Sequence, residues 1–451
     1  MTLLTDAIAR VDAVDPLGVR GSVEELRGLS LLVDDLPVGV GSLVSVGDGR
    51  RGEVVGFSGG SAVVMLLDGS TGVRPGDPVR SLESTPTMSG GRSLLGRVVN
   101  GLGEPIDGRG PLMETRPVPL HAAPVNAMSR GRIRTPLSTG VRTLDLLTTV
   151  GLGQRMGVFA GPGVGKSTLL SGIAKHSSSD LSVIALIGER GREVGDFIEH
   201  TLGESGLARS VVVVATSDES PLLRVRAGLG ACALAQSFAD NGDHVTLVFD
   251  SVTRFAHAQR QIGLAVGEPP ATKGYTPSVF AQLPLLLERA GVMASGGSIT
   301  GFYSVLVEGD DMTEPIADAV RGILDGHVIL SRKLARQGHF PAIDPLDSIS
   351  RLAEDITGET HRAARSWVIK LLSAYAEAEE LIQIGAYAQG ADLLTDVAVE
   401  LKPQLDQLLR QARGEHEGID ESLPKMVALA QQAQTLVERR AAGAGAGRRG
   451  G

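Results

Sequence analysis

The sequence predicts an α/β protein in three parts: a small β-rich domain, a central domain built on a parallel sheet, and a helical domain. Three observations support this prediction. Short apolar runs alternate with glycine-rich turns near the N-terminus, strands and helices then alternate around a glycine-rich loop, and apolar residues finally recur at helical spacing. A chain of 451 residues is also too long for one core. We expect the segments 1–18, 19–88, 89–358, 359–440 and 441–451.

The composition excludes several classes of protein. The net charge of −9, from 52 acidic and 43 basic residues, argues against nucleic acid as the main partner. Cys232 is the only cysteine and cannot form an internal disulfide, which is typical of a reducing cytoplasm. No stretch of about 18 uncharged apolar residues occurs, so we expect nothing to span a membrane.

The first 18 residues form a separate segment, in which Leu3, Leu4, Ala7, Ile8 and Val11 have helical spacing. This pattern fits either a frayed terminus or an amphipathic helix that docks on a partner.

Short β-like runs follow, and we expect strands at Ser42–Val46, Glu53–Phe57 and Ala62–Leu67. Strands of this length and spacing suggest a small barrel or sandwich. Phe57 is its only aromatic residue, so no base-stacking platform is expected there. The composition of Ser81–Gly91 indicates a linker.

The glycine-rich loop follows an expected strand end, Val158–Ala160, and precedes a helix expected to begin at Lys166. Backbone N–H groups of such a loop and helix start converge on a phosphate. Lys166 would reach the outer phosphates, and the Ser167 hydroxyl would ligate Mg²⁺. Ala160 stands where the strict pattern has its first glycine. The predicted loop residues are Ala160, Gly161, Pro162, Gly163, Val164, Gly165, Lys166, Ser167 and Thr168.

Four further strands are expected in the central domain, at Val183–Ile187, Val211–Ala215, Val245–Phe249 and Ile299–Val307. In open α/β sheets the ligand crevice lies at the carboxyl edge of the strands, where polar residues cluster in this sequence. Asp250 follows one strand and is expected to hold Mg²⁺, although an aspartate there can also be a helix cap.

Glu189 follows another strand, with Arg190 and Arg192 beside it. A carboxylate that polarises an attacking water needs nearby cations to stay ionised, so Glu189 is a candidate catalytic base. The alternative is a solvated charge cluster. Arg254 either reaches phosphate oxygens or pairs with a neighbouring carboxylate.

Two residues lie further along the chain. Arg351 follows a proline turn and either acts as an arginine finger in a neighbouring subunit or forms a surface salt bridge. Phe340 either stacks on a base or belongs to the core. From Arg362 onward the spacing is helical, and the last segment, 441–451, is of low complexity and expected to be disordered.

Several long strings make a resemblance specific: AGPGVGKSTLL, GERGREVGDFIE, VTLVFDSVTRFAHAQR, GEPPATKGYTPSVFAQLPLLLERAG and VEGDDMTEPIADAVRGILDGHVILSR. They resemble the rotary-type ATPase family of the proton-translocating ATP synthases. Within it they are most similar to the type III secretion ATPases, especially the flagellum-specific ones. The resemblance implies an N-terminal β-barrel, a RecA-like nucleotide domain and a C-terminal helical domain in a ring of six.

The resemblance also implies roles for single residues. It makes Glu189 the catalytic glutamate, Arg190 a γ-phosphate contact and Arg254 another phosphate-facing arginine. It makes Arg351 the interfacial arginine finger and Phe340, in place of a tyrosine, the aromatic residue that packs on adenine. With Lys166 and Asp250 on the same chain, these residues favour a homo-oligomer with ATP and Mg²⁺ as ligands.

The function implied is ATP hydrolysis that energises export of flagellar proteins at the cytoplasmic face of a type III apparatus. The implied partners are a stator-like negative regulator, for which residues 2–15 are the candidate contact, export chaperone–substrate complexes and the export gate. The alternatives are a virulence-type secretion ATPase, the catalytic subunit of an ion-translocating synthase and, less favoured, an RNA or DNA translocase.

Overall fold

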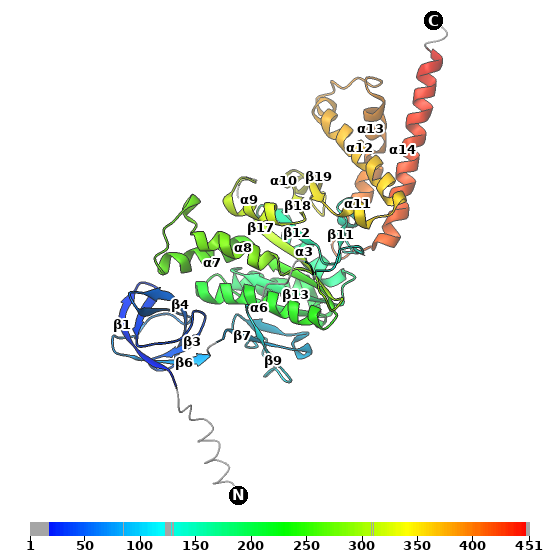
Figure 1. Cartoon of the computed structure of the whole chain (residues 1–451). Coiled ribbons are helices and arrows are strands. Elements are labelled where there is room, and N and C mark those ends of the chain that lie inside the picture. The colour runs from blue at the N-terminus through cyan, green and yellow to red at the C-terminus, as the bar shows by residue number, and fades with distance from the viewer. Residues whose placement is uncertain are drawn as a thin grey trace.

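The computed structural model describes residues 18–83, 85–121, 128, 130–307, 309 and 311–447. A β-barrel and a helical domain lie at opposite ends of a central α/β domain, so the molecule is elongated (Figure 1). The amphipathic segment expected in the first 18 residues lies, apart from Gly18, outside the described residues. Among the helices of the described chain, none is long and apolar enough to cross a bilayer.

The barrel is closed and antiparallel, with the strand order β1-β2-β5-β4-β3-β6. Its three sequence-predicted strands are confirmed as β3, β4 and β5. Valine and leucine side chains fill the interior, among them Val33, Val44 and Val64. The bounds are β1 (Arg20–Arg27), β2 (Ser30–Asp34), β3 (Leu43–Val46), β4 (Arg50–Ser58), β5 (Ser61–Leu66) and β6 (Pro78–Glu83).

The prediction of a linker over Ser81–Gly91 is wrong for most of its length. The stretch contains the end of β6 and all of β7 (Thr87–Gly90), which pairs with β9 (Arg116–Pro119). Met88 of β7 is buried in the main core, and this burial outweighs the loop-like composition around it. The following segment includes η1 (Arg92–Leu94) and contributes β8 (Val98–Asn100), a short strand at the edge of the central sheet.

The central sheet has nine strands in the order β19-β18-β12-β17-β15-β13-β14-β8, with β16 paired to β17. Only β19 and β16 run antiparallel to their neighbours; the other pairs are parallel. The expected strands in this domain are confirmed. The remaining bounds are β12 (Arg155–Ala160), β13 (Leu181–Ile187), β14 (Ser210–Ala215), β15 (His244–Asp250), β16 (Gly291–Val292), β17 (Ser298–Leu306), β18 (Gly326–Leu330) and β19 (Ile343–Ser350), with β10 (Pro136–Leu137) and β11 (Val150–Gly151) as a separate pair.

Helices cover both faces of this sheet, because its strands are apolar on both sides. One core contains side chains from α6, α7, α8 and α9, and the other contains side chains from α3, η3 and α5. The bounds are α2 (Arg142–Leu147), α3 (Lys166–His176), α4 (Gly191–Asp196), η3 (Phe197–Leu202), α5 (Gly203–Ala208), α6 (Pro221–Asp240), α7 (Val252–Ala265), η4 (Thr272–Gly274), α8 (Pro277–Leu287), α9 (Pro315–Ile323), α10 (Arg332–Arg336) and α11 (Ala353–Ile356).

The C-terminal domain consists of α12 (Glu359–Gln383), α13 (Leu393–Leu409) and α14 (Ile419–Gly447). Its core also includes Leu146 and Leu147 of α2, so α2 joins the two domains. The prediction that 441–451 is disordered is wrong as far as Gly447, because α14 continues through this stretch, whose alanines favour a helix. Residues 448–451 lie outside the described chain.

Candidate active site

The phosphate loop connects β12 to α3 at the carboxyl edge of the sheet. Gly163 and Gly165 have φ angles of 78° and 92°, a left-handed conformation that glycine adopts without strain. Gly165 is the N-cap of α3, so the free N–H groups of the first helical turn face the loop. The side chains of Ser167 and Thr168 are exposed. This local geometry has the strand, glycine loop and helix start expected from the sequence, and a helix N-terminus of this kind can bind an anion.

Four charged side chains meet beside this loop, and all come from the carboxyl ends of β12, β13 and β15 or from the segments that directly follow these strands. The Lys166 ammonium lies 2.5 Å from Oδ1 of Asp250 and 3.5 Å from Oε1 of Glu189. Arg254 of α7 places a guanidinium nitrogen 3.1 Å from Oε2 of Glu189 and also donates to the Gly188 carbonyl. Two cations thus balance two carboxylates. Of the alternatives for Arg254, the structure contains the pairing with a carboxylate.

Asp250 and Glu189 occupy different environments within this cluster. Asp250 is 2% exposed and accepts a hydrogen bond of 2.7 Å from the Ser304 hydroxyl of β17. Burial raises the pKa of Glu189, and the nearby Lys166 and Arg254 cations only partly oppose that effect. A carboxyl whose pKa lies closer to neutrality accepts a proton more readily, as a general base must.

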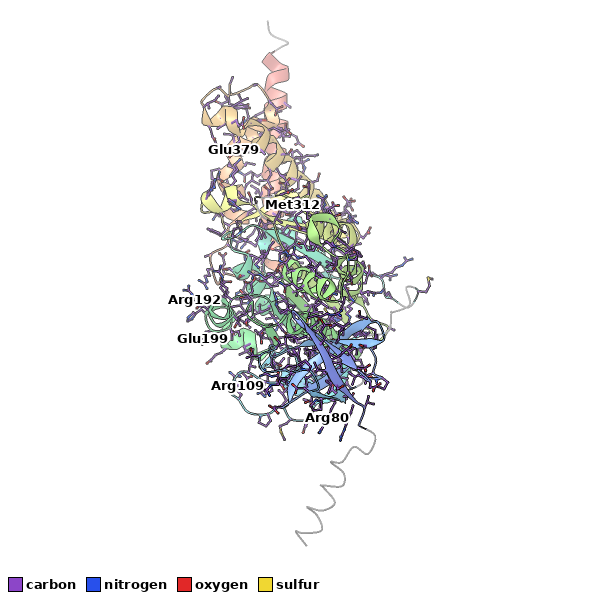
Figure 2. All side chains as sticks on the ribbon, turned by 90° about the vertical axis from the view of Figure 1, so that its left-hand side faces the viewer. Arg80, Arg109, Arg192, Glu199, Met312 and Glu379 are labelled. Carbon is purple, nitrogen blue, oxygen red and sulfur yellow. The ribbon has the colours of Figure 1, made fainter. Side chains whose placement is uncertain are left out.

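Arg190 and Arg351 lie outside this cluster. The Arg190 side chain is 78% exposed and pairs with Glu193 at 3.5 Å. Its neighbour Arg192 is 89% exposed and lies at the surface of the same segment (Figure 2). Arg351 follows the edge strand β19, with an exposed side chain and its N–H bonded to the Asp325 carbonyl.

A pocket of about 670 Å³ opens beside the phosphate loop. Val164, Gly165 and Leu169 line one side, Phe340 lines another, and residues 410–415 of the C-terminal domain close a third. The Phe340 ring is 44% exposed and packs over Gly165. Phe340 is therefore a pocket residue rather than a core residue.

The sequence did not identify two contributors to this site. Ser304 hydrogen-bonds Asp250 from β17, and residues 410–415 reach the pocket from another domain. A serine within an apolar strand is a weak local signal for the first. No local signal in the sequence connects the loop after α13 to a helix more than 200 residues earlier.

Comparisons with known proteins agree with this architecture. Residues 140–350 match the family model "ATP synthase alpha/beta family, nucleotide-binding domain", and residues 33–83 match the β-barrel domain of the same family. Residues 357–428 match "T3SS EscN ATPase C-terminal domain".

Whole-chain relatives are similarly consistent. The chain is 49% identical to the flagellum-specific ATP synthase of Treponema pallidum, over 89% of this chain and 91% of the relative. It is 47% identical to the flagellum-specific ATP synthase of Bacillus subtilis, over 94% of this chain and 98% of the relative. The type 3 secretion system ATPase of Sinorhizobium fredii is 46% identical, over 91% and 92%.

A solved structure shows the same fold. The assembled ATPase EscN of the enteropathogenic Escherichia coli type III secretion system superposes with a TM-score of 0.86 at 37% identity, over 91% of this chain and 100% of that one. These findings confirm the fold class and the resemblance. The chain belongs to the ATP synthase alpha/beta family, among its ATP-hydrolysing flagellum-specific and type III secretion members.

Proposed function

We propose that this enzyme hydrolyses ATP to energise export of flagellar proteins through a type III apparatus, as a homo-hexameric ring at the cytoplasmic face of that apparatus. The observation that supports it most is the meeting of Lys166, Glu189, Asp250 and Arg254 beside the phosphate loop of a single chain. Every subunit of a ring made from this chain alone would then carry a phosphate site with its own general base, Glu189.

The triphosphate of ATP lies on loop 160–168 in this proposal. Backbone N–H groups at the start of α3 hydrogen-bond its oxygens, and Lys166 neutralises the outer phosphates. The adenine base of ATP lies in the pocket against Phe340, whose aromatic ring can stack on it.

Mg²⁺ fits the oxygen atoms at this edge. Within the described ranges no group of three or more His, Cys, Asp or Glu side chains is arranged as a metal cage. Mg²⁺ needs none, since it usually takes one or two protein oxygens together with phosphate oxygens and waters. The exposed Ser167 hydroxyl and the Asp250 carboxylate are such oxygens. Bound there, Mg²⁺ would neutralise charge on the phosphates.

Glu189 orients the attacking water and accepts its proton. Arg254 holds one oxygen of this carboxylate at 3.1 Å, which fixes the direction of the other oxygen toward Lys166 and the phosphate loop. The raised pKa of Glu189 suits a base that must take up a proton near neutral pH.

Arg351 completes the site of the neighbouring subunit as an arginine finger. Its exposed position at the end of an edge strand leaves the guanidinium accessible to another chain. Such a finger stabilises negative charge in the transition state and contributes on the order of 10³–10⁵ to the rate. Arg190, exposed beside Glu189, would turn toward the γ-phosphate when nucleotide binds.

Partners are proposed by analogy with the relatives. EscN has been solved in complex with its central stalk EscO, and we expect this ring to bind a stalk protein of its own. A stator-like regulator, chaperone–substrate complexes and the export gate complete the proposed set, with no role for nucleic acid.

A gene deletion tests the flagellar assignment. Cells that lack the chain should form no flagellar filament, and the wild-type gene should restore filaments while Lys166→Ala, expressed to the same level, should not. Normal filaments in the deletion strain would reject the flagellar role and favour a virulence-type system. Co-purification of a second large ring subunit would instead favour a synthase, and stimulation of hydrolysis by RNA or DNA would favour a translocase.

A further inference from the structure

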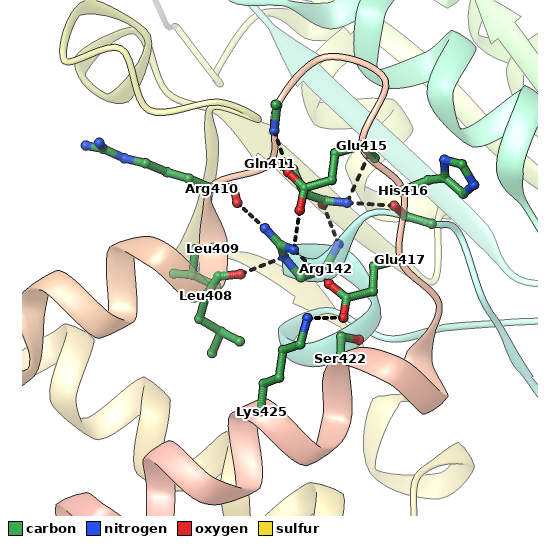
Figure 3. Close-up of polar contacts among 12 residues, drawn as sticks. Arg142, Leu408, Leu409, Arg410, Gln411, Glu415, His416, Glu417, Ser422 and Lys425 are labelled. Carbon is green, nitrogen blue, oxygen red and sulfur yellow. Dashed lines mark hydrogen bonds and ion pairs between the residues drawn. The ribbon is translucent and has the colours of Figure 1, made fainter.

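The third wall of the pocket beside the phosphate loop, in which we place the adenine, belongs to the C-terminal domain. One buried side chain holds this wall in place. Arg142, at the start of α2, has a side chain that is 8% exposed, and it points into the loop between α13 and α14 (Figure 3). This loop includes residues 410–415, which line the pocket.

The guanidinium of Arg142 contacts one residue at the end of α13 and three residues of the loop that follows it. Its Nε donates to the Leu408 carbonyl at 3.0 Å and an Nη donates to the Arg410 carbonyl. The other Nη lies 2.6 Å from Glu415 and 2.7 Å from Glu417. The planar guanidinium is suited to bonding several acceptors at once, which a single ammonium cannot do.

Gln411 transmits this anchoring to the other walls of the pocket. Its side-chain oxygen accepts from the backbone N–H of Arg142 at 2.8 Å, a contact that does not involve the guanidinium, and its side-chain nitrogen donates to the Gly140 carbonyl at 3.0 Å. Its backbone N–H donates to the Phe340 carbonyl at 2.8 Å. The aromatic wall is therefore bonded directly to the loop that Arg142 holds.

The charges around Arg142 favour its contacts with the loop between α13 and α14. A hydrogen bond from the Ala412 N–H, followed by contact with Arg142, lowers the pKa of Glu415. Lys425 and Arg142 together outweigh burial and lower the pKa of Glu417. Both carboxylates are thus ionised at neutral pH, and each would lose a cation if Arg142 were replaced.

We propose that Arg142 is a positioning residue for nucleotide binding, because its guanidinium fixes the 410–415 wall, and Gln411 of that wall is hydrogen-bonded to the backbone of Phe340. The inference rests on the proposed place of the base against Phe340. Affinity for the adenine base then depends on Arg142, whereas affinity for the phosphates depends on the loop at 160–168.

Binding measurements on the full-length protein separate these two parts of the ligand. In calorimetry with Mg²⁺, Arg142→Met should weaken ADP binding about tenfold or more, equivalent to losing about one well-formed contact. Inorganic tripolyphosphate, which has no base, should bind within about twofold of wild type. Arg142→Lys should give intermediate ADP affinity. The KM for ATP should rise with little change in kcat.

Thr143→Val is the matched control, because Thr143 donates across the same interface to the Leu409 carbonyl at 3.2 Å, outside the pocket wall. It should leave ADP affinity unchanged. Phe340→Ala tests the base site itself and should weaken ADP binding without affecting tripolyphosphate.

Two outcomes would overturn the inference. One is wild-type ADP affinity in Arg142→Met while Phe340→Ala binds ADP weakly. The other is parallel loss of ADP and tripolyphosphate binding in Arg142→Met, which indicates general misfolding. Unchanged ADP affinity in Phe340→Ala would instead reject the proposed base site.

Discussion

Lys166 connects the phosphate loop to both carboxylates of the proposed site, which makes it the residue whose removal is most informative. Without its ammonium, Asp250 keeps the Ser304 hydroxyl and Glu189 keeps Arg254, so each carboxylate retains a partner. We expect Lys166→Ala to lower kcat by about 100-fold or more, as loss of one donor to developing charge does in other enzymes.

The control for Lys166→Ala is its thermal unfolding, which should stay close to that of wild type. Hydrolysis at the wild-type rate would mean that the phosphate site has been placed wrongly.

If Glu189 is the general base, the rate of hydrolysis should depend on pH in a way that its raised pKa determines. The base must be ionised to accept a proton, so kcat/KM should fall as pH is lowered through the pKa of Glu189. Because burial raises this pKa, the acid limb of the profile should lie above the ordinary range of a glutamate. Glu189→Gln should abolish turnover and leave ADP binding intact.

Glu199→Gln makes the same chemical change on the exposed surface of the same segment (Figure 2) and should leave both rate and profile unaltered. An acid limb at the pH of an unperturbed carboxyl would contradict the assignment of Glu189 as base.

Among the elements, α14 allows a test of where the stable fold ends. Ala433 is buried in the helical core and Leu436 and Val437 pack against it, whereas the side chains of Ala441 and Ala442 are exposed. Truncation after Arg440 should therefore leave the melting temperature of the protein unchanged.

Truncation after Gln431 removes those three apolar side chains and should lower the melting temperature clearly. Full burial of a valine or leucine side chain contributes about 1.5–3 kcal/mol, and the partly buried Leu436 and Val437 contribute a share of that. If the shorter truncation were as destabilising as the longer one, the contacts of Ala433, Leu436 and Val437 would not account for the stability that α14 contributes.

Elements differed in how far the sequence could predict them. Strands such as β13 and β14 were predictable because they are continuous apolar runs, which buried parallel strands require. The three-residue β8 was not, since its position depends on pairing with β14 rather than on its own composition. For the same reason, β7 was mistaken for part of a linker.

The residues of the candidate site also fall into those whose position the sequence could predict and those for which it could not. The positions of the phosphate loop, Glu189 and Asp250 were predictable because each lies at or just beyond the carboxyl end of an apolar strand. The partners of those residues were not, because the order of the strands in the sheet decides which ends are neighbours. Arg142 had no signal either, since its acceptors lie more than 260 residues away in sequence.

At the scale of the whole molecule, the central claim is that a complete site needs two chains. Arg351 stands at an exposed edge, apart from the Lys166 cluster, so a subunit that lacks one of these residues should still supply the other to its neighbour. Specific ATPase activity should accordingly rise with protein concentration as subunits associate.

The most direct measurement mixes two inactive variants. Lys166→Ala retains its arginine finger, and Arg351→Ala retains its phosphate loop, so each alone should hydrolyse ATP at a small fraction of the wild-type rate. Mixed in equal amounts and reassembled, they should recover activity, because about a quarter of the contacts in a random ring would combine both intact halves. A mixture no more active than its components, or an Arg351→Ala protein as active as wild type, would contradict a site shared between subunits.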